Sequence, residues 1–449
     1  MLHALVEAGA NVFRLNMSHA THEWVRQIVP RIRAVAKELD TIVGILMDTQ
    51  GPAIRTGDLA TKLNLKQGDV FEFTVRGEKS EEVYSVDVNY DGLVDDISVG
   101  DTVLVDNGVI HMKVLAKDGS RIRCEVLTEG LMGSRRHINL PGVKVNLPPL
   151  TEKDLADVAV GAELGVDFVA LSFCREAKDV GVLRKVLAEH GSSARIVAKI
   201  EDQLAIRNIN DIIDATDIVM IARGDLGIEC PAEDLPIIQR KIVKRCLRTG
   251  VPVIVATHML ESMISNPVPT RAEITDVANA VYEQADAVML SGETTVGKYP
   301  VECVRVLDKV ARRIERSGGA GFAIEAQLES DRQKTVRSAV NLANSFPDAK
   351  LVVFTRRGRM ANFVSNQRPP AAPIHVFAPT YEVCRRLALN WSTSAHHLVF
   401  DTNPVRTIAA AISHLIAGGH VQSGEHLVVV SDMLAGEERF DSIQLRIVP

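Results

Sequence analysis

The chain has 449 residues, with 51 lysines and arginines, 57 aspartates and glutamates, and a formal net charge of −6. At roughly 150 residues per domain this length predicts about three domains, and 46% hydrophobic with 24% charged residues is a globular composition rather than a disordered or fibrous one. The near balance of charge excludes a global field that would attract nucleic acid or an anionic membrane, so acidic ligands need local basic sites.

The cysteines and the apolar stretches bear on the compartment. The six cysteines are scattered, contain no CxxC pair and come without a signal peptide, which favours reduced thiols. No apolar stretch approaches the roughly 18 residues that would suggest a membrane-spanning helix. We therefore expect a cytoplasmic protein that has neither a membrane nor a nucleic acid as its partner.

Seven short apolar runs with polar ends alternate with helical patterns, which is typical of βα units around a parallel sheet. A fully buried parallel strand reads as a continuous apolar run, and ligands bind at the carboxyl ends of such strands. Except between the second and third runs, consecutive starts lie about 20 to 35 residues apart, which leaves room for a helix and two loops. The runs are residues 11–18, 42–49, 167–173, 195–201, 217–225, 252–259 and 286–293.

The long interval after the second run contains an insert. From about Gly57 to Leu140 short alternating strands and turns replace the βα pattern. We expect residues 57–140 to form an all-β domain in a barrel loop, on the face where barrel loops carry function. The α/β barrel domain would then comprise residues 1–56 and 141–317.

A third region follows the glycine-rich stretch RSGGAG at 316–321. In residues 318–449 apolar runs, among them HHLVF at 396–400, alternate with helical segments, which predicts an open C-terminal α/β sheet. In TRRGR the backbone N–H groups and the arginines could hold a phosphorylated effector. A surface turn with solvated arginines is the alternative interpretation. The loop consists of Thr355, Arg356, Arg357, Gly358 and Arg359.

Polar residues gather at the predicted carboxyl ends of the barrel strands, which strand geometry directs to a single mouth. Glu201 and Asp225 end neighbouring strands, so their carboxylates can converge on one Mg²⁺ and leave room for substrate oxygens. Lys199 points the same way as Glu201, because side chains alternate along a strand. The strand-end residues are Arg14, Asn16, Ser18, His19, Asp48, Thr49, Arg55, Lys199, Glu201, Arg223, Asp225, Thr257, Ser291 and Glu293.

Each of these residues also has a purely structural interpretation. Lys199 and Glu201 could form a core ion pair, and Arg223 and Asp225 a loop salt bridge. Hydroxyls after strands, such as that of Thr257, are commonly ordinary helix caps, and the same holds for Ser291. Taken together the residues favour a ligand site, because burying so many charges without a ligand would cost several kcal/mol per unpaired ion.

An Mg²⁺ held by two carboxylates beside lysine and arginine suits phosphoryl transfer, in which positioning and charge stabilisation supply most of the catalysis. A hydroxyl at Thr257, near Ser291 and Glu293, could pass a proton through water to an enolate formed beside the metal. Four other strand-end side chains offer oxygens with one formal charge among them, which suits a monovalent cation better than a second Mg²⁺. These four are Asn16, Ser18, Asp48 and Thr49.

Successive blocks of the sequence resemble the signature motifs of the pyruvate kinase family, in the family's order from Met1 through the third region. The resemblance implies a (β/α)8 TIM barrel that transfers the phosphoryl group of phosphoenolpyruvate to ADP, giving pyruvate and ATP in the last step of glycolysis. The blocks are NVFRLNMSHATHE, LMDTQGPAIRTGD, INLPGVKVNLPPLTEKD, IVAKIED, MIARGDLGIE, VATHMLESMISNPVPTRAEITDVANAV and VMLSGETTVGKYP.

The resemblance also implies roles for the matching residues. Mg²⁺ or Mn²⁺ would bind Glu201 and Asp225, K⁺ would bind the four oxygen ligands named above, and Arg14 and Lys199 would hold the phosphoryl group in transfer. The carboxylate of phosphoenolpyruvate would bind at the strand end that carries Arg223. Its ligands there would be the backbone of Ala222, Gly224 and Asp225 together with Thr257.

Three further features are implied by the resemblance alone. Nucleotide phosphates would contact Arg55, His19 and the insert's Arg136, and the insert would act as a lid that excludes water when ADP binds. The assembly would be a homotetramer.

The chain also departs from the family pattern. Family members begin with a strand before the first helix, whereas this sequence starts inside that helix, so we expect the first barrel strand to be absent and two sheet edges to be exposed. A start assigned too late, a fragment and a truncated natural form are the open interpretations. Ala53 replaces a Glu that accompanies K⁺ dependence in the family, or a Lys that substitutes for the cation in its K⁺-independent members. An inactive truncated paralogue, or another Mg²⁺-dependent enolate-forming barrel enzyme, is the alternative function.

Overall fold

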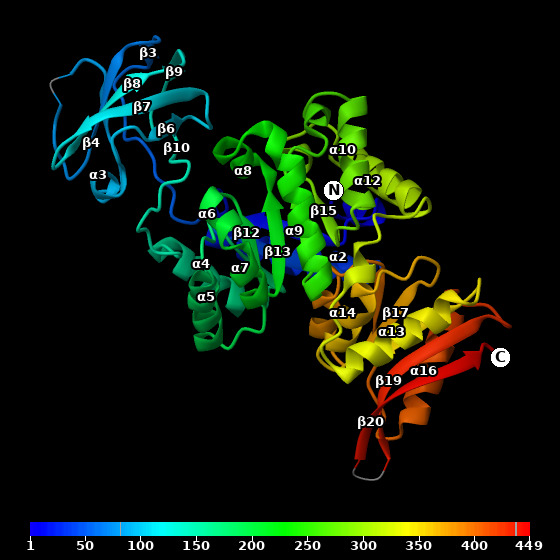
Figure 1. Cartoon of the computed structure of the whole chain (residues 1–449). Helices are drawn as coiled ribbons and strands as arrows, with labels where there is room; N and C mark the ends of the chain where they lie inside the picture. The colour runs from blue at the N-terminus through cyan, green and yellow to red at the C-terminus, as the bar shows by residue number, and fades with distance from the viewer. Residues whose placement is uncertain (81, 436–437) are drawn as a thin grey trace.

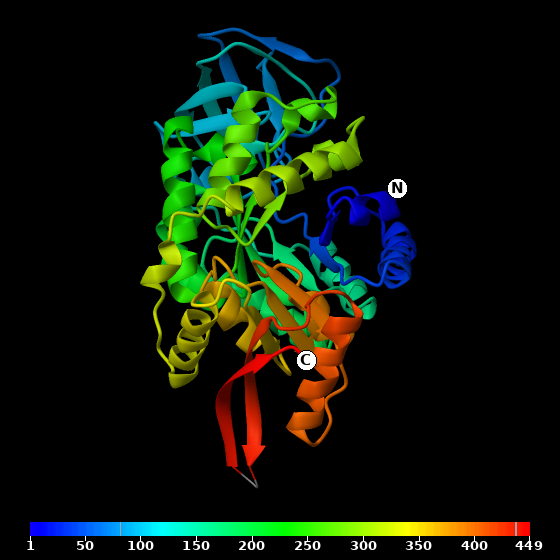
Figure 2. The ribbon, with the colours of Figure 1, turned by 90° about the vertical axis from the view of Figure 1, so that its right-hand side faces the viewer.

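The computed structural model describes residues 1–80, 82–435 and 438–449. Three regions lie in a row: the inserted region at one end, the barrel-like region in the middle and the C-terminal region at the other end (Figures 1 and 2). Each region has a hydrophobic core of its own. In the described residues no helix is both long enough and apolar enough to cross a membrane.

The central sheet consists of seven parallel strands that coincide with the seven predicted apolar runs. Each strand pairs with the next one along the chain, so the order in the sheet is the order in the sequence. The prediction of a curled parallel βα sheet is therefore confirmed. The strands are β1 (Val12–Asn16), β2 (Gly44–Asp48), β11 (Phe168–Leu171), β12 (Arg195–Ile200), β13 (Ile218–Ala222), β14 (Val253–Ala256) and β15 (Ala287–Met289).

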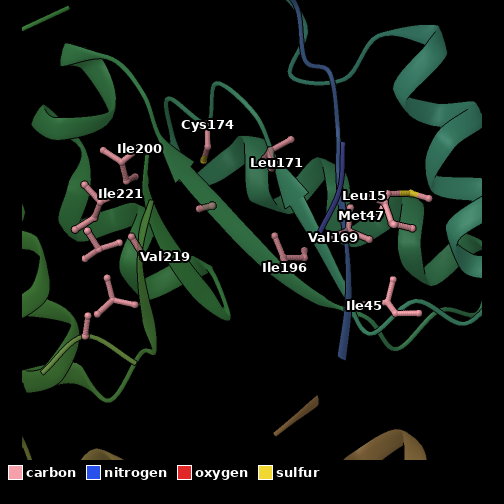
Figure 3. Close-up of a cluster of buried hydrophobic side chains, with 14 of the residues drawn as sticks. Leu15, Ile45, Met47, Val169, Leu171, Cys174, Ile196, Ile200, Val219 and Ile221 are labelled. Atoms are coloured by element: carbon pink, nitrogen blue, oxygen red, sulfur yellow. The ribbon is translucent and has the colours of Figure 1, made fainter. Parts of the chain in front are cut away.

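Side chains alternate between the two faces of this sheet, as a period of two residues requires. One face packs against the helices, with Ile45, Met47, Val169 and Ile221 among its members (Figure 3). The opposite face forms the interior of the curled sheet, where Leu389 of the C-terminal region also packs. Both faces of each strand are thus buried, which explains why the strands are continuous apolar runs in the sequence.

Helices cover the outer face of the sheet, and hydroxyl or acidic residues start several of them. Thr151 and Asp154 form a capping box, as do Thr270 and Glu273, and Gly250 ends its helix at a φ of +81°. The helices are α1 (Leu2–Glu7), α2 (His22–Glu38), α4 (Glu152–Glu163), α5 (Ala177–Glu189), α6 (Gln203–Arg207), α7 (Ile209–Ala215), α8 (Arg223–Glu229), α9 (Leu235–Thr249), α10 (Arg271–Tyr282), α11 (Gly292–Thr295) and α12 (Pro300–Glu315).

The sheet has two edges, as the sequence predicted. Among the described residues β1 pairs only with β2, and β15 pairs only with β14. The side chains of β15 are half-buried, whereas those of the interior strand β13 are fully buried. Helix α1 packs against both α2 and α12, so the helical layer continues across the opening in the sheet.

The inserted region is a small β structure, as predicted, apart from one helical turn. Its main sheet has the order β10-β6-β7-β8-β4-β5, and β3 pairs with β9. Phe71 and Phe73 pack in its core with ring centroids 4.9 Å apart. Its elements are β3 (Leu63–Leu65), β4 (Val70–Thr74), β5 (Ser85–Asp87), α3 (Leu93–Asp96), β6 (Thr102–Val105), β7 (Ile110–Lys117), β8 (Arg121–Val126), β9 (Gly130–Met132) and β10 (Ile138–Asn139).

The C-terminal region is the predicted open α/β sheet, in the order β18-β17-β16-β19-β20, with only β20 antiparallel. One strand was misplaced: the run at 396–400 was predicted, but Leu398 and Phe400 pack on the core beyond the end of the strand. The elements are α13 (Asp331–Asn344), β16 (Lys350–Phe354), α14 (Arg359–Asn366), β17 (Ile374–Ala378), α15 (Tyr381–Arg386), β18 (Thr393–His397), α16 (Pro404–Ala417), β19 (His426–Ala435) and β20 (Glu438–Ile447).

Three aspartates at the amino ends of alternate strands mark the face of the barrel that meets the C-terminal region. Each accepts the backbone N–H of a residue near the start of the neighbouring strand: Ile45 N to Asp167, Ile196 N to Asp217 and Val253 N to Asp286, at 2.8 to 3.0 Å. Two of them also bind an arginine of the C-terminal region. Arg385 donates to Asp167 at 2.9 Å, and Arg368 donates to Asp286 at 2.7 Å.

Candidate active site

A cavity of about 370 Å³ opens at the carboxyl ends of the barrel strands, between the barrel and the inserted region. It has the size of an ordinary small-molecule site. Polar and charged side chains from both regions line it, in agreement with the predicted gathering of strand ends at one mouth. The predicted site residues that line it are Arg14, Asn16, Ser18, Thr49, Arg55, Arg136, Lys199, Glu201 and Asp225.

Lys199 lies at the floor of this cavity, at the end of β12, and is almost fully buried. Its ammonium Nζ lies 2.8 Å from Glu201 Oε1, 2.9 Å from Ser172 Oγ and 3.2 Å from Asp48 Oδ1. Burial by itself lowers the pKa of Lys199, but the Asp48 and Glu201 carboxylates outweigh it, so the pKa is raised. The lysine therefore remains a fixed positive charge that faces the cavity.

Asp48, at the end of β2, forms ion pairs with both Arg14 and Lys199. Arg14 Nε donates to Asp48 Oδ2 at 2.6 Å, and the Asp48 carboxylate is fully buried. Burial alone would raise the pKa of Asp48, but Lys199 and Arg14 outweigh it and lower the pKa. Asp48 is thus an ionised anchor between the positive charges of Arg14 and Lys199.

Glu201 and Asp225 line the same cavity, as the predicted divalent-metal site requires. Burial raises the pKa of Glu201; the Lys199 ammonium opposes this effect, and the Asp225 carboxylate adds to it. Phe173 N donates to Glu201 Oε2 at 2.6 Å and so fixes its orientation. A divalent cation shared by the two carboxylates would remove their repulsion, and Mg²⁺ prefers such hard oxygen donors, so the residues fit the ion.

Not all of the four predicted K⁺ ligands line the cavity. Asn16, Ser18 and Thr49 line the cavity, whereas Asp48 lies beneath them. Asn16 Oδ1 accepts the Ser18 N–H at 3.1 Å, and the Thr49 hydroxyl donates to Ala170 O at 2.9 Å. In the described residues no three His, Cys, Asp or Glu side chains form a metal cluster.

The stretch after β13 does not contain the predicted salt bridge between Arg223 and Asp225. Arg223 does not pair with Asp225; its guanidinium donates to both carboxylate oxygens of Asp276, at 2.6 and 2.7 Å, and to Thr257 O at 2.8 Å. The salt-bridge interpretation was wrong because Asp276, on α10, offers a two-point partner that the sequence spacing did not reveal. Ala222, at the end of β13, is buried beside it.

Gly224 and Thr257 touch. A Cβ on Gly224 would lie 2.8 Å from Thr257 Cγ2, so the backbone of α8 approaches the next strand end as closely as glycine permits. Thr257 and His258 have φ angles of +76° and +56°, a left-handed conformation that costs of order 1 to 3 kcal/mol in a residue with a side chain. Neither helix α8 nor the loop after β14 uses Thr257 as a cap.

Ser291 and Glu293 lie after β15 and do not line the cavity. Glu293 is buried, and its carboxylate accepts Leu260 N at 3.1 Å and Ser291 N at 2.6 Å. The Ser291 side chain makes no cap hydrogen bond at the start of α11, so its interpretation as an ordinary cap is wrong. Glu293 thus fixes the backbone at Leu260 and Ser291.

The predicted nucleotide contacts are distributed over two regions. Arg55 and Arg136 line the cavity, with Arg136 Nη1 at 3.2 Å from Asp106 Oδ1 and its Nε buried without a hydrogen-bond partner. Arg55 Nη1 donates to Arg135 O at 3.2 Å. His19 is exposed and lies outside the lining.

The predicted effector loop forms the start of α14. Thr355 is buried and its hydroxyl accepts Gly358 N at 3.0 Å, while Gly358 has a φ of +88°. Arg356 lies over the Phe400 ring, 5.3 Å from its centroid. Arg357 and Arg359 are exposed and line a crevice between the C-terminal region and the amino ends of the barrel strands.

Sequence reasoning missed several residues of the cavity, among them Ser172, Phe173, His137 and Asp106. Ser172 and Phe173 follow β11 and hold Lys199 and Glu201, and their position directly after an apolar run was a usable signal. His137 packs on Phe173 with ring centroids 5.9 Å apart, and burial lowers the pKa of His137. Asp106 lies in a turn of the insert, where nothing in the sequence distinguished it from other turn acids.

The fold is that of an α/β barrel enzyme, and its cavity is lined by a buried lysine, an arginine and two carboxylates. Residues 1–304 match the family model described as pyruvate kinase, barrel domain, and residues 333–445 match the one described as pyruvate kinase, alpha/beta domain. The chain belongs to the pyruvate kinase family. Its enzymes transfer the phosphoryl group of phosphoenolpyruvate to ADP, giving pyruvate and ATP.

Individual relatives are similar in sequence to this chain over almost its whole length. A pyruvate kinase of Geobacillus stearothermophilus is 40% identical over 442 residues, which cover 96% of this chain and 75% of the relative. One from Clostridium acetobutylicum is 36% identical and covers 95% of this chain and 92% of the relative. The crystal structure of a pyruvate kinase from Cryptosporidium parvum superposes with a TM-score of 0.94 at 32% identity, covering 100% of this chain and 93% of that one.

Proposed function

We propose that phosphoryl transfer from phosphoenolpyruvate to ADP takes place in the cavity above Lys199. The observation that carries this proposal is the buried ammonium of Lys199, held between Asp48, Ser172 and Glu201 and open to the cavity. Arg14 lies beside it on the same aspartate. A phosphoryl group in flight spreads negative charge over its oxygens, and two fixed cations stabilise that charge without reorganising.

The carboxylate of phosphoenolpyruvate would bind at the start of α8, to the backbone of Ala222, Gly224 and Asp225 and to the Thr257 hydroxyl. The close contact of Gly224 with Thr257 and the left-handed φ of Thr257 support a backbone shaped for a ligand. Arg223 would act as a positioning residue, because its guanidinium is occupied by Asp276 and by the backbone oxygen of Thr257.

Mg²⁺ or Mn²⁺ would be held by Glu201 and Asp225, and K⁺ by Asn16, Ser18, Asp48 and Thr49. When bound, the divalent ion supplies Lewis-acid stabilisation of the developing negative charge. Thr257 would deliver the proton to the enolate through water, with Ser291 and Glu293 behind it. Glu293 supports this by fixing the backbone of Leu260 and Ser291 rather than by touching substrate.

ADP would enter between the barrel and the inserted region, with its phosphates near Arg55, Arg136 and His19. The unpartnered Arg136 Nε supports a contact that is completed only when nucleotide binds. Closure of residues 57–140 as a lid would exclude water from the transfer. The division into 1–56 with 141–317, 57–140 and 318–449 is part of the same proposal, supported by the separate cores.

The remaining expectations concern the compartment, the subunit assembly and the regulation of the enzyme. We propose a cytoplasmic, glycolytic enzyme, supported by six free cysteines, which are typical of a reducing compartment, although some relatives are plastidial. A homotetramer and a phosphorylated effector at Thr355–Arg359 complete the proposal. Light scattering after size-exclusion chromatography would measure the subunit number.

The decisive experiment is a coupled assay with lactate dehydrogenase and NADH. We expect oxidation of NADH that requires phosphoenolpyruvate, ADP and Mg²⁺ together, and that is stimulated by K⁺. Pyruvate formation without ADP would instead indicate another enolate-forming barrel enzyme. No pyruvate from a folded protein that binds phosphoenolpyruvate and Mg²⁺ would contradict the proposed transfer.

A further inference from the structure

Helix α8 connects the proposed substrate site with the inserted region. Its amino end follows β13 at the cavity, where Asp225 is one of the two proposed ligands of the divalent metal. Its carboxyl end, at Glu229, contacts the inserted region. Asp225 and Glu229 lie about 6 Å from each other along the helix axis and on the same face. A movement of one end of so short a helix therefore moves the other end.

The first contact is a buried hydrogen bond between Glu229 and Asn139, the last residue of β10. Asn139 Nδ2 donates to Glu229 Oε1 at 3.1 Å, and both residues are almost fully buried. Such a bond is electrostatically stronger in the interior than in water, and a buried carboxylate that loses its partner bears the full cost of desolvation. The pair therefore holds the end of β10 against the end of α8.

A second contact lies beside the first. Gly108, in a turn of the inserted region, packs against Ile228 of α8: a Cβ on Gly108 would lie 3.1 Å from Ile228 Cγ2. The same turn carries Asp106, which pairs with Arg136 at 3.2 Å. Arg136 is a proposed contact of the nucleotide phosphates. A nucleotide that moves this turn would therefore also move the end of α8.

The carboxyl end of α8 is also fixed to the barrel. Gln203 Nε2, on α6, donates to Glu229 O at 2.5 Å. Between β12 and α6 lie Glu201, which is the other proposed metal ligand, and Asp202. Glu229 thus has a partner in the inserted region through its side chain and a partner near the metal site through its backbone oxygen.

The contact with Glu229 does not use the whole of the Asn139 amide. Its Oδ1 is buried without a hydrogen-bond partner. Most buried polar atoms in proteins are hydrogen-bonded, so this oxygen calls for an explanation other than the stability of the inserted region. An apolar side chain at this place would avoid the cost, but it could not hold Glu229.

We propose that Asn139 and Glu229 are positioning residues that couple the inserted region to the phosphoenolpyruvate and metal ligands at the amino end of α8. Neither is among the described residues that line the cavity, so both act through α8 rather than by touching substrate. The inference rests on the proposed places of phosphoenolpyruvate and ADP. It gives the lid a defined path by which nucleotide binding in one region changes the affinity for the substrate in the other.

Steady-state kinetics of Asn139→Ala, Glu229→Ala and the double variant test this coupling. Each single change should raise KM for phosphoenolpyruvate about tenfold and leave kcat within about threefold, because the ligands on α8 are displaced and Lys199 is not. The double variant should be no worse than either single variant, since both changes break one contact. Values of KM within about twofold of the wild type, or losses that multiply, would overturn the proposal.

A conservative variant and matched controls separate positioning from a general loss of structure. Glu229→Gln keeps an oxygen that accepts from Asn139 Nδ2 and adds an N–H that can donate to Asn139 Oδ1, so KM should stay within about threefold of the wild type. Asn64→Ala and Glu233→Ala, at exposed positions of the inserted region and before α9, should leave KM unchanged. A Glu229→Gln variant as poor as Glu229→Ala would contradict the proposal.

Hydrogen exchange in residues 223–230 tests the coupling without turnover. We expect these amides to exchange faster in Asn139→Ala than in the wild type, although the substitution lies in another region, and to be unaffected in Asn64→Ala. Unchanged exchange in Asn139→Ala would overturn the coupling. A wild-type protein that forms no pyruvate would instead contradict the proposed function, and the exchange measurement would still decide the coupling.

Discussion

Arg223 and Asp276 form a two-point ion pair, and Arg223 Nη2 at the same time donates to the backbone oxygen of Thr257. The side chain of Arg223 is largely buried. A residue that the sequence suggested as a substrate ligand is therefore a brace between α8, α10 and the end of β14.

The brace can be tested by a double-mutant cycle. Asp276→Asn and Arg223→Lys should each lower kcat/KM for phosphoenolpyruvate by about tenfold to a hundredfold, and their combination should cost much less than the product, because both break one contact. Asp308→Asn, which breaks the exposed Arg312–Asp308 pair, is the matched control and should change little. Fully additive losses would show that the two residues act separately.

Lys199→Met should reduce turnover by at least about 10³-fold while phosphoenolpyruvate still binds, because a transition-state charge is lost. Steady-state kinetics and a binding titration measure the two effects. Circular dichroism must show an intact fold, and Lys185→Met, an exposed lysine on α5, is the control. Near-normal turnover would remove Lys199 from the proposed chemistry.

Asp225→Ala should abolish the Mg²⁺ dependence of phosphoenolpyruvate binding, since one of two metal carboxylates is lost. Glu201→Gln should do the same with a smaller change of shape. Calorimetric titration of Mg²⁺ and of Mn²⁺ in the presence of phosphoenolpyruvate measures the effect directly. Asp234→Asn, an exposed carboxylate beside α9, should leave both titrations unchanged.

Gly224→Ala should raise KM for phosphoenolpyruvate by about tenfold, because its Cβ would lie 2.8 Å from Thr257 Cγ2 and push the two strand ends apart. Thr257→Ser removes that methyl group and keeps the hydroxyl, so the double variant should recover most of the loss. Michaelis constants of the four proteins give the answer. A double variant as poor as Gly224→Ala would show that the contact is not the cause.

The C-terminal region should lose stability as the pH falls from about 6.5 toward 4. Burial, with the neighbouring His420 and Lys350, lowers the pKa of His375 to about 4, and burial with His375, His414 and His420 lowers that of His396 to about 3. The unfolded chain binds protons from about pH 6.5 that the folded state refuses, so acid favours unfolding until the folded pKa values are reached.

Urea unfolding at a series of pH values, followed by the fluorescence of Trp391, measures this dependence. His375→Gln with His396→Gln should flatten it between pH 6.5 and 4, whatever the stability at neutral pH. His190→Gln, an exposed histidine after α5, should leave the slope unchanged. A slope that the double variant retains would mean that other groups carry the protons.

Most of the barrel could be predicted because burial on both faces leaves a plain trace: runs such as 217–225 are apolar until the strand ends. The same logic located Lys199, Glu201 and Asp225 together. Contacts that depend on distant elements could not be found, as the Asp276 partner of Arg223 shows, nor could the strand shifted from 396–400 to Thr393–His397. Alternation along 438–447 was overlooked, so β20 was missed.

Strand β11 joins the two ends of the barrel. Asp167, just before its start, accepts a hydrogen bond from Arg385. Just beyond its end, Ser172 is hydrogen-bonded to Lys199 and Phe173 to Glu201. From Asp167 to Ser172 the extended chain makes five steps, which span about 17 Å and bend little. A tilt of the C-terminal region that moves Asp167 would therefore be transmitted along the strand to Ser172 and Phe173, and would move the partners of Lys199 and Glu201 while the strand stays intact.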